Sequence, residues 1–80
     1  MRLITLRSST LMNVGYDPGD EVMVAQFANG AYYRYSGVPA GIYLAVLSDT
    51  ESHGKAFDRL IKKGPYPYER LDPETVEFTI

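Results

Sequence analysis

Over the first half of the chain, hydrophobic residues recur at a period of two, which is typical of β-strands. This pattern predicts strands over residues 11–16, 21–28 and 31–36, with a further strand over residues 2–6. Residues 17–20 (DPGD) fit a type II turn with Gly19 at the positive-φ position. Asn29-Gly30 fits a two-residue type I′ turn. The first half therefore predicts an antiparallel meander.

The second half changes to a helical period. A first helix is expected after Pro39, and its buried stripe is Ile42, Tyr43, Val46 and Leu47. A second helix is expected over residues 54–63, with Phe57, Leu60 and Ile61 on its apolar face and Gly64-Pro65 as its stop. Residues 66–68 are expected to be extended and residues 76–80 to form a last strand. The predicted fold class is α+β: a small antiparallel β-meander of three or more strands with two helices packed on one face.

The predicted turns decide which residues share a face of the sheet. A two-residue turn at Asn29-Gly30 and a Pro18-Gly19 turn give the pairs Phe27–Tyr32, Gln26–Tyr33, Ala25–Arg34, Val24–Tyr35 and Val14–Met23. The more apolar face is expected beneath the helices, and it holds Met12, Val14, Met23, Ala25, Phe27, Tyr32 and Arg34. Tyr33 and Tyr35 then lie on the opposite face, beside Asn13, Val22, Val24 and Gln26.

Two tyrosines spaced i, i+2 on an open sheet are able to stack successive bases. The same pattern is also compatible with structural tyrosines covered by the terminal strands or by residues 66–68. The exposure of Tyr33 and Tyr35 decides between these interpretations.

Length and charge narrow the function classes. Eighty residues form one domain, with a net charge of −2 and no cysteine, so disulfides, thiolate zinc sites and cysteine nucleophiles are excluded. No apolar run approaches the ~20 residues of a membrane span, and a cytoplasmic protein without membrane association is expected. Residues 53–70 contain five basic and two acidic residues, whereas residues 71–80 contain three acidic residues and no basic one. A local basic patch on a mildly acidic protein is therefore expected.

No motif indicates catalysis, a metal or a cofactor. His53 is the single histidine, and a zinc site needs three or four converging ligands. Ser8-Ser9-Thr10 lacks the Gly-x-Ser-x-Gly context of a serine nucleophile. Gly54-Lys55 is not preceded by the glycine-rich run of a phosphate loop. The sequence predicts a non-enzymatic binding module.

Several short motifs occur together in one order. They are Ser8-Ser9, Val14-Gly15-Tyr16-Asp17, Phe27 with Asn29-Gly30, Tyr33-Arg34-Tyr35 running into Val38-Pro39, Ser52-x-Gly54, Phe57, Ile61-Lys62 and Tyr66-Pro67-Tyr68. In these residues the chain resembles the KTSC domain, named for its place at the C-terminus of some lysyl-tRNA synthetases and found also in small free-standing proteins. The resemblance covers about residues 8–70 of a single domain spanning 1–80, with residues 71–80 as an additional strand.

The resemblance suggests RNA binding through the synthetase context. The family tends to be basic around its final Tyr-Pro-Tyr, whereas this chain has Glu69 there and an acidic tail, which weakens that suggestion.

Three functions stay open for a monomer or homodimer of bacterial or phage origin. The first is binding of RNA or other single-stranded nucleic acid; the candidate ligand-binding residues are Tyr33, Arg34, Tyr35, Lys55, Arg59, Lys62, Tyr66 and Tyr68. The second is a protein-interaction module, such as an inhibitor or adaptor of a mobile element, acting through the Tyr33 and Tyr35 face or through residues 76–80. The third is a nucleotide-binding protein in which the same tyrosines clamp one purine.

Overall fold

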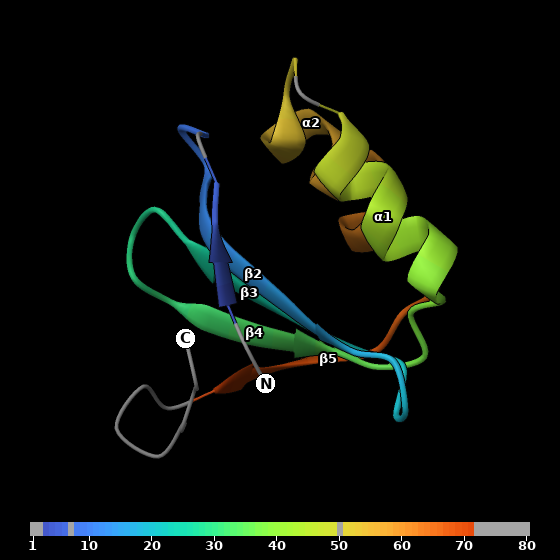
Figure 1. Cartoon of the computed structure of the whole chain (residues 1–80). Helices are drawn as coiled ribbons and strands as arrows, with labels where there is room; N and C mark the ends of the chain where they lie inside the picture. The colour runs from blue at the N-terminus through green and yellow to red at the C-terminus, as the bar shows by residue number, and fades with distance from the viewer. Residues whose placement is uncertain (1–2, 7, 50, 72–80) are drawn as a thin grey trace.

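A computed structural model describes residues 3–6, 8–49 and 51–71 (Figure 1). Its five strands are β1 (Leu3–Thr5), β2 (Leu11–Asp17), β3 (Val22–Phe27), β4 (Tyr32–Tyr35) and β5 (Tyr68–Leu71). They form one antiparallel sheet in the order β1-β2-β3-β4-β5. The predicted α+β meander with two helices is confirmed, and β5 extends it beyond the residues expected to pair. The strand expected over residues 76–80 lies outside the described residues.

The β3–β4 turn differs from the prediction by one residue. Phe27 N donates to Ala31 O (2.9 Å) and Gly30 N donates to Phe27 O (2.8 Å), so the loop has three residues, 28–30. Gly30 takes the positive φ, +89°. This is the three-residue hairpin in which a tight turn is followed by a left-handed residue. The two-residue type I′ assignment for Asn29-Gly30 was therefore wrong.

One residue of register moves every side chain of β4 to the other face. Met23 pairs with Tyr35, Ala25 with Tyr33, and Val24 with Arg34. Tyr33 and Tyr35 consequently share the helix-facing side with Met23 and Ala25. The predicted faces of Tyr32, Tyr33, Arg34 and Tyr35 were all wrong for this one reason.

The β2–β3 turn also differs from the prediction, but by two residues. Asp17 pairs with Val22 and Val14 with Ala25, which leaves a four-residue loop. Oδ1 of Asp17 accepts hydrogen bonds from the backbone N–H groups of Gly19 and Asp20. The positive φ falls on Glu21 (+54°) rather than on Gly19, so the type II assignment was wrong. A shift of two keeps each side chain on its face.

Met12 departs from its predicted face for a different reason. The β2–β3 register shifts between Leu11 and Asn13, so Met12 lies at an irregularity of the ladder. Its side chain is exposed, while Leu11 is fully buried. A bulge of this kind accommodates one extra residue in one strand and redirects the side chains around it.

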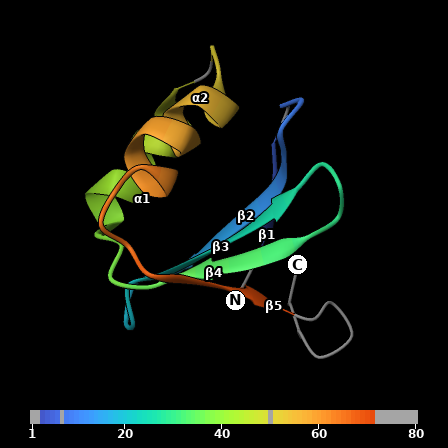
Figure 2. The same cartoon turned by 180° about the vertical axis from the view of Figure 1, so that it is seen from behind.

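Both helical segments lie on the same side of the sheet (Figures 1 and 2). Helix α1 (Ala40–Ser48) packs through Tyr43 and Val46. Helix α2 (His53–Phe57) begins after Ser52, whose Oγ accepts a hydrogen bond from Lys55 N. It continues directly into a π-helical turn, η1 (Asp58–Lys62). These segments correspond to the two predicted helices.

The core lies between the helices and the sheet, and its fully buried members include Leu11, Val14, Met23, Val46, Phe57 and Ile61. The Phe57 ring meets those of Phe27 (5.5 Å between centroids) and Tyr35 (5.4 Å) edge to face. This confirms the predicted packing of the second helix on β3. Phe57 also forms the floor against which the aromatic residues of β4 are arranged.

Candidate ligand-binding groove

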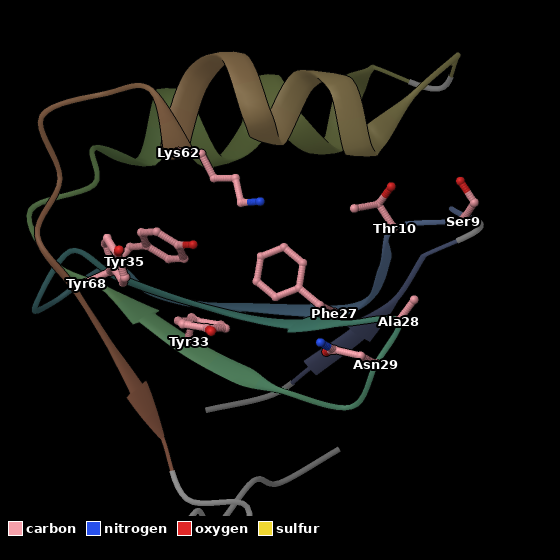
Figure 3. A pocket seen from close by; sticks show the side chains of 9 residues that line it. All are labelled: Ser9, Thr10, Phe27, Ala28, Asn29, Tyr33, Tyr35, Lys62 and Tyr68. Atoms are coloured by element: carbon pink, nitrogen blue, oxygen red, sulfur yellow. The ribbon is translucent and has the colours of Figure 1, made fainter.

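A groove runs between the helix-facing side of the sheet and the segment α2–η1. It consists of two adjoining hollows of about 690 Å³ and about 510 Å³. Both are lined by Ser9, Thr10, Phe27 and Lys62, which makes them one continuous surface. We call the part formed by Phe27, Tyr33, Tyr35 and Tyr68 the aromatic end (Figure 3). The part formed by Ser8, Ser9, Thr10, Ser52 and Lys55 is the hydroxyl end.

The aromatic end is a connected set of rings on three neighbouring strands. Tyr33 contacts Phe27 at 5.4 Å and Tyr68 at 6.0 Å, both edge to face, and Tyr35 contacts Tyr68 at 5.7 Å. Tyr35 is only 3% exposed, as the structural interpretation of this tyrosine expects, whereas Tyr33 is half-buried and Tyr68 is 67% exposed. The rings thus grade from a buried floor to an open rim, a shape suited to a flat apolar group entering from solvent.

The hydroxyl of Tyr35 stays protonated over a wide pH range. Burial, with smaller contributions from the neighbouring Tyr33 and Tyr68, raises the pKa of Tyr35 to about 12. Tyr35 therefore remains a neutral group that is able to donate a hydrogen bond at physiological pH.

Lys62 reaches into the groove from the helical side. Its Nζ lies 5.1 Å from the centre of the Phe27 ring, a cation–π contact. Within the described ranges, Lys62 makes no ion pair; Asp58 instead pairs with Lys63, Oδ2 to Nζ, at 3.4 Å. The groove therefore contains an ammonium group without a carboxylate partner.

The π-helical turn accounts for the position of Lys62. Lys62 follows Phe57 by five residues, and in an α-helix this spacing turns two side chains about 140° apart. A π-turn closes its hydrogen bond one residue later, and Lys63 N indeed donates to Asp58 O (3.1 Å). The wider turn brings residue i+5 back toward the direction of residue i. Lys62 thereby joins Phe57 on the side that faces the sheet.

The hydroxyl end brings together two motifs that are distant in sequence, Ser8-Ser9 and Ser52-x-Gly54. Oγ of Ser8 accepts hydrogen bonds from Thr10 N (3.1 Å) and Leu11 N (3.3 Å), which orders this loop. A Cβ at Gly54 would lie 3.0 Å from Thr10 Oγ1 and 3.1 Å from Thr10 Cβ. A residue without a side chain at position 54 lets the serine loop approach α2 this closely.

His53 lies at the same end but is tied to the helix layer. Its Nδ1 is 3.1 Å from the carbonyl oxygen of Val46 in α1, so Nδ1–H donates and Nε2 is left to face other partners. His53 thus links α1 to α2. Among the residues described, no three histidine, cysteine or acidic side chains gather as a metal site would require.

The structure divides the predicted site residues into two groups. The groove is lined by Tyr33, Tyr35, Lys55, Lys62 and Tyr68. The residues outside it are Arg34, Arg59 and Tyr66. Arg34 lies on the opposite face, where its Nε pairs with Glu69 Oε1 at 3.2 Å. Arg59 is exposed beside the groove, and Tyr66 packs against the core and over Gly64.

In the hollow of about 690 Å³, sequence reasoning missed five lining residues: Ser9, Thr10, Phe27, Ala28 and Asn29. Phe27 was assigned to the core, which is also correct, because its ring contacts Phe57. Ser9 and Thr10 were considered only as nucleophiles. The spaced pair of motifs Ser8-Ser9 and Ser52-x-Gly54 was the available signal, because small residues often mark close approach of two segments.

Comparisons with known proteins agree with this arrangement. The family model for the KTSC domain matches residues 7–75. The chain belongs to the KTSC domain family. An uncharacterized protein of Stutzerimonas stutzeri is 38% identical over 72 residues, which are 90% of this chain and 100% of that protein. A protein of Tsukamurella paurometabola is 32% identical over 57 residues, 71% of this chain and 84% of its own length.

A crystal structure of a KTSC domain protein from Yersinia pestis has the same fold. The TM-score is 0.82 at 30% identity, with 89% of this chain and 97% of that chain covered. The five-stranded sheet with its helices on one side is therefore the KTSC fold. Of the described helices, none is long and apolar enough to cross a membrane.

Proposed function

We propose that this KTSC domain is a non-enzymatic module that binds single-stranded nucleic acid, RNA in the first instance, in the groove between the sheet and α2–η1. The observation that carries the proposal is the joint presence, in one groove, of four aromatic rings and the ammonium of Lys62, which forms no ion pair with any described residue. Aromatic faces accept any base by stacking, and a nearby ammonium attracts the phosphate. The bases enter the groove rather than lying across an open sheet.

The exposed members of the aromatic end are the groups that meet a base first. Tyr68 is largely exposed and Tyr33 partly so, whereas Tyr35 lies beneath them. The Lys62 ammonium occupies the face of Phe27 in the free protein. A base that stacks on Phe27 displaces this ammonium, which is then free to approach the phosphate of the same strand.

The overall charge of −2 makes this a stacking-dominated interaction. Counterion release is expected to be small, because Lys55 and Lys62 are the only basic residues in the described part of the chain that line the groove. The affinity should therefore depend only weakly on salt. For single strands, the logarithm of the binding constant falls with the logarithm of the salt concentration with a slope of about −0.7 for each phosphate contact. The slope expected for two lysine contacts is thus about −1.4.

The test is a fluorescence-anisotropy titration with a labelled single-stranded RNA at several salt concentrations. We expect Tyr33→Ala to weaken binding about tenfold to a hundredfold, because one stacked base contributes ~1–3 kcal/mol. Lys62→Ala should flatten the salt slope by about 0.7. Arg59→Ala is the matched control, since Arg59 is a basic residue of the same η1 turn that does not line the groove.

Two outcomes would contradict the proposal. One is the absence of binding at low salt by the folded wild type. The other is a loss in Arg59→Ala or Arg34→Ala as large as that in Tyr33→Ala, which would place the interaction outside the groove. Thermal melts of each variant show whether a loss of binding is separate from a loss of folding.

A further inference from the structure

The two ends of the groove differ in chemistry, and this difference bears on which part of a strand the groove receives. The aromatic end carries rings and a single charged side chain, Lys62. The hydroxyl end carries the hydroxyls of Ser9 and Thr10 and the ammonium of Lys55 beside that of Lys62. No hydrogen bond or ion pair engages these four polar groups within the part of the chain that the structure describes.

We infer that the groove receives a terminal nucleotide, with its base at the aromatic end and a terminal phosphomonoester at the hydroxyl end. The inference rests on the proposed function and names the part of the strand that this same site takes. A terminal phosphomonoester carries about −1.5 to −2 charges and three acceptor oxygens at neutral pH. Two ammonium groups and two hydroxyls match that charge and those acceptors better than they match an internal phosphodiester.

The closure of the aromatic end supports a strand end rather than a strand interior. The connection from η1 to β5 passes around this end of the groove, next to Tyr35 and Tyr68 (Figure 3). Ser36 N donates to Pro67 O (3.0 Å), which fastens the connection to the end of β4. A strand therefore does not run lengthwise past this connection, and beyond the terminal nucleotide it leaves on the open side of the groove, at the exposed Tyr68.

The carboxylates of the hydroxyl end do not cancel its lysines. Glu51 and Asp58 both line this part of the groove. Asp58 is engaged by Lys63, so its charge is already compensated. Glu51 remains, and together with Lys55 and Lys62 it leaves this end with a net charge of +1, which attracts one phosphate. A single phosphate held between Lys55 and Lys62 is the arrangement that these four charges favour.

The test compares three RNA oligonucleotides of one sequence, with a 5′-phosphate, with a 3′-phosphate, and with neither, all binding the full chain. We expect one phosphorylated form to bind at least about tenfold more tightly than the unphosphorylated form. The reason is that hydrogen bonds between charged groups are stronger than those between neutral groups. Thr10→Val and Lys55→Ala should both bring this ratio close to one. Arg59→Ala, the control, should preserve it.

The outcomes separate the two proposals. If all three oligonucleotides bind the wild type equally well, the terminal-phosphate inference is wrong and the proposed function stands. If none binds, the proposed function fails and the inference fails with it. A phosphate preference that survives both Thr10→Val and Lys55→Ala would place the phosphate elsewhere and overturn the assignment of the hydroxyl end.

Discussion

The two sides of the sheet differ in whether some of their polar side chains have partners. On the outer face, away from the helices, Thr5 Oγ1 donates to Asn13 Oδ1 (2.8 Å), and Asn13 Nδ2 donates to Gln26 Oε1 (2.7 Å). Arg34 and Glu69 form an ion pair on this same face. In the groove, the Lys62 ammonium and the Ser9 and Thr10 hydroxyls have no hydrogen-bond or ion-pair partner among the described residues.

This difference supports the proposal that a ligand binds on the groove side. A polar group that is already paired gains little from a new partner, because an existing interaction has to be broken first. An unpaired ammonium beside exposed rings loses little and gains a charge-assisted contact. We therefore interpret the outer face as a structural surface whose polar side chains already have partners, and the groove as the binding side.

The largest expected effect comes from exchanging the two faces of strand β4, so that its outward-facing residues turn toward the helices. Deleting Ala28 leaves the two-residue Asn-Gly loop, which shifts β4 by one residue and turns Arg34 toward the core in place of Tyr33 and Tyr35. Burying an unpaired guanidinium costs several kcal/mol, against a total stability of about 4–12 kcal/mol for a domain of this size. We expect the deletion variant to be unfolded by circular dichroism. A native melting temperature would show that the register does not depend on this loop; Ala28→Ser, at an exposed position, is the control.

The second effect removes the floor of the groove. Phe57→Ala eliminates a fully buried ring that contacts Phe27 and Tyr35. The expected loss is about 3–5 kcal/mol in the free energy of unfolding, from lost burial and the cavity left behind. Urea titration measures it. Leu44→Ala, on the 56% exposed side chain of α1, should cost far less, and equal losses in the two variants would contradict the packing described.

The third effect is a pH dependence that belongs to the groove side. The pKa of Tyr35 is about 12 in the folded protein, mainly because the side chain is buried, whereas an unfolded tyrosine titrates near 10. The raised pKa of Tyr35 makes a contribution to the free energy of unfolding that is complete below pH ~10. This contribution is lost as the pH rises toward ~12, because the hydroxyl proton of Tyr35 dissociates from the unfolded chain at lower pH than from the folded one. In the Tyr35→Phe variant, stability should fall less steeply between pH ~10 and ~12, and urea titrations at several pH values measure this. The same fall in the variant as in the wild type would contradict the contribution assigned to Tyr35.

The smallest effect belongs to the outer face. Arg34 and Glu69 are both about half exposed (48% and 58% of their side chains), and an exposed ion pair contributes about 0–1 kcal/mol. Arg34→Ala should therefore change stability by less than about 1 kcal/mol and leave RNA affinity unchanged. A clear loss of affinity in this variant, with the melting temperature retained, would move the binding surface to the outer face.

The fold was largely predictable because the hydrophobic residues recur with clear strand and helix periods. Alternation in the first half and helical spacing of Phe57, Leu60 and Ile61 predict the meander and the second helix, and the structure confirms both. Apart from Met12, which lies at the irregularity between β2 and β3, the faces depended on loop length. The β2–β3 loop was misjudged by two residues, which left Val14, Met23 and Ala25 on the correct face.

The β3–β4 loop was misjudged by one residue, which moved the tyrosines to the wrong face. Asn29-Gly30 does not distinguish the two loops, because Gly30 takes a positive φ in either. The groove was less predictable still. The groove brings Ser9 and Thr10 together with Lys62 across the helix–sheet interface. Lys62 reaches the groove through a π-helical turn, which no local sequence pattern predicts.

We propose that the groove, and not the outer face, binds single-stranded nucleic acid. Chemical-shift mapping by NMR, with a single-stranded RNA titrated into the labelled protein, distinguishes the two surfaces. We expect the shifts to concentrate at Thr10, Phe27, Tyr33, Lys62 and Tyr68, with little change at Asn13, Gln26 and Arg34. Shifts confined to the outer face, or no shifts at low salt, would contradict it.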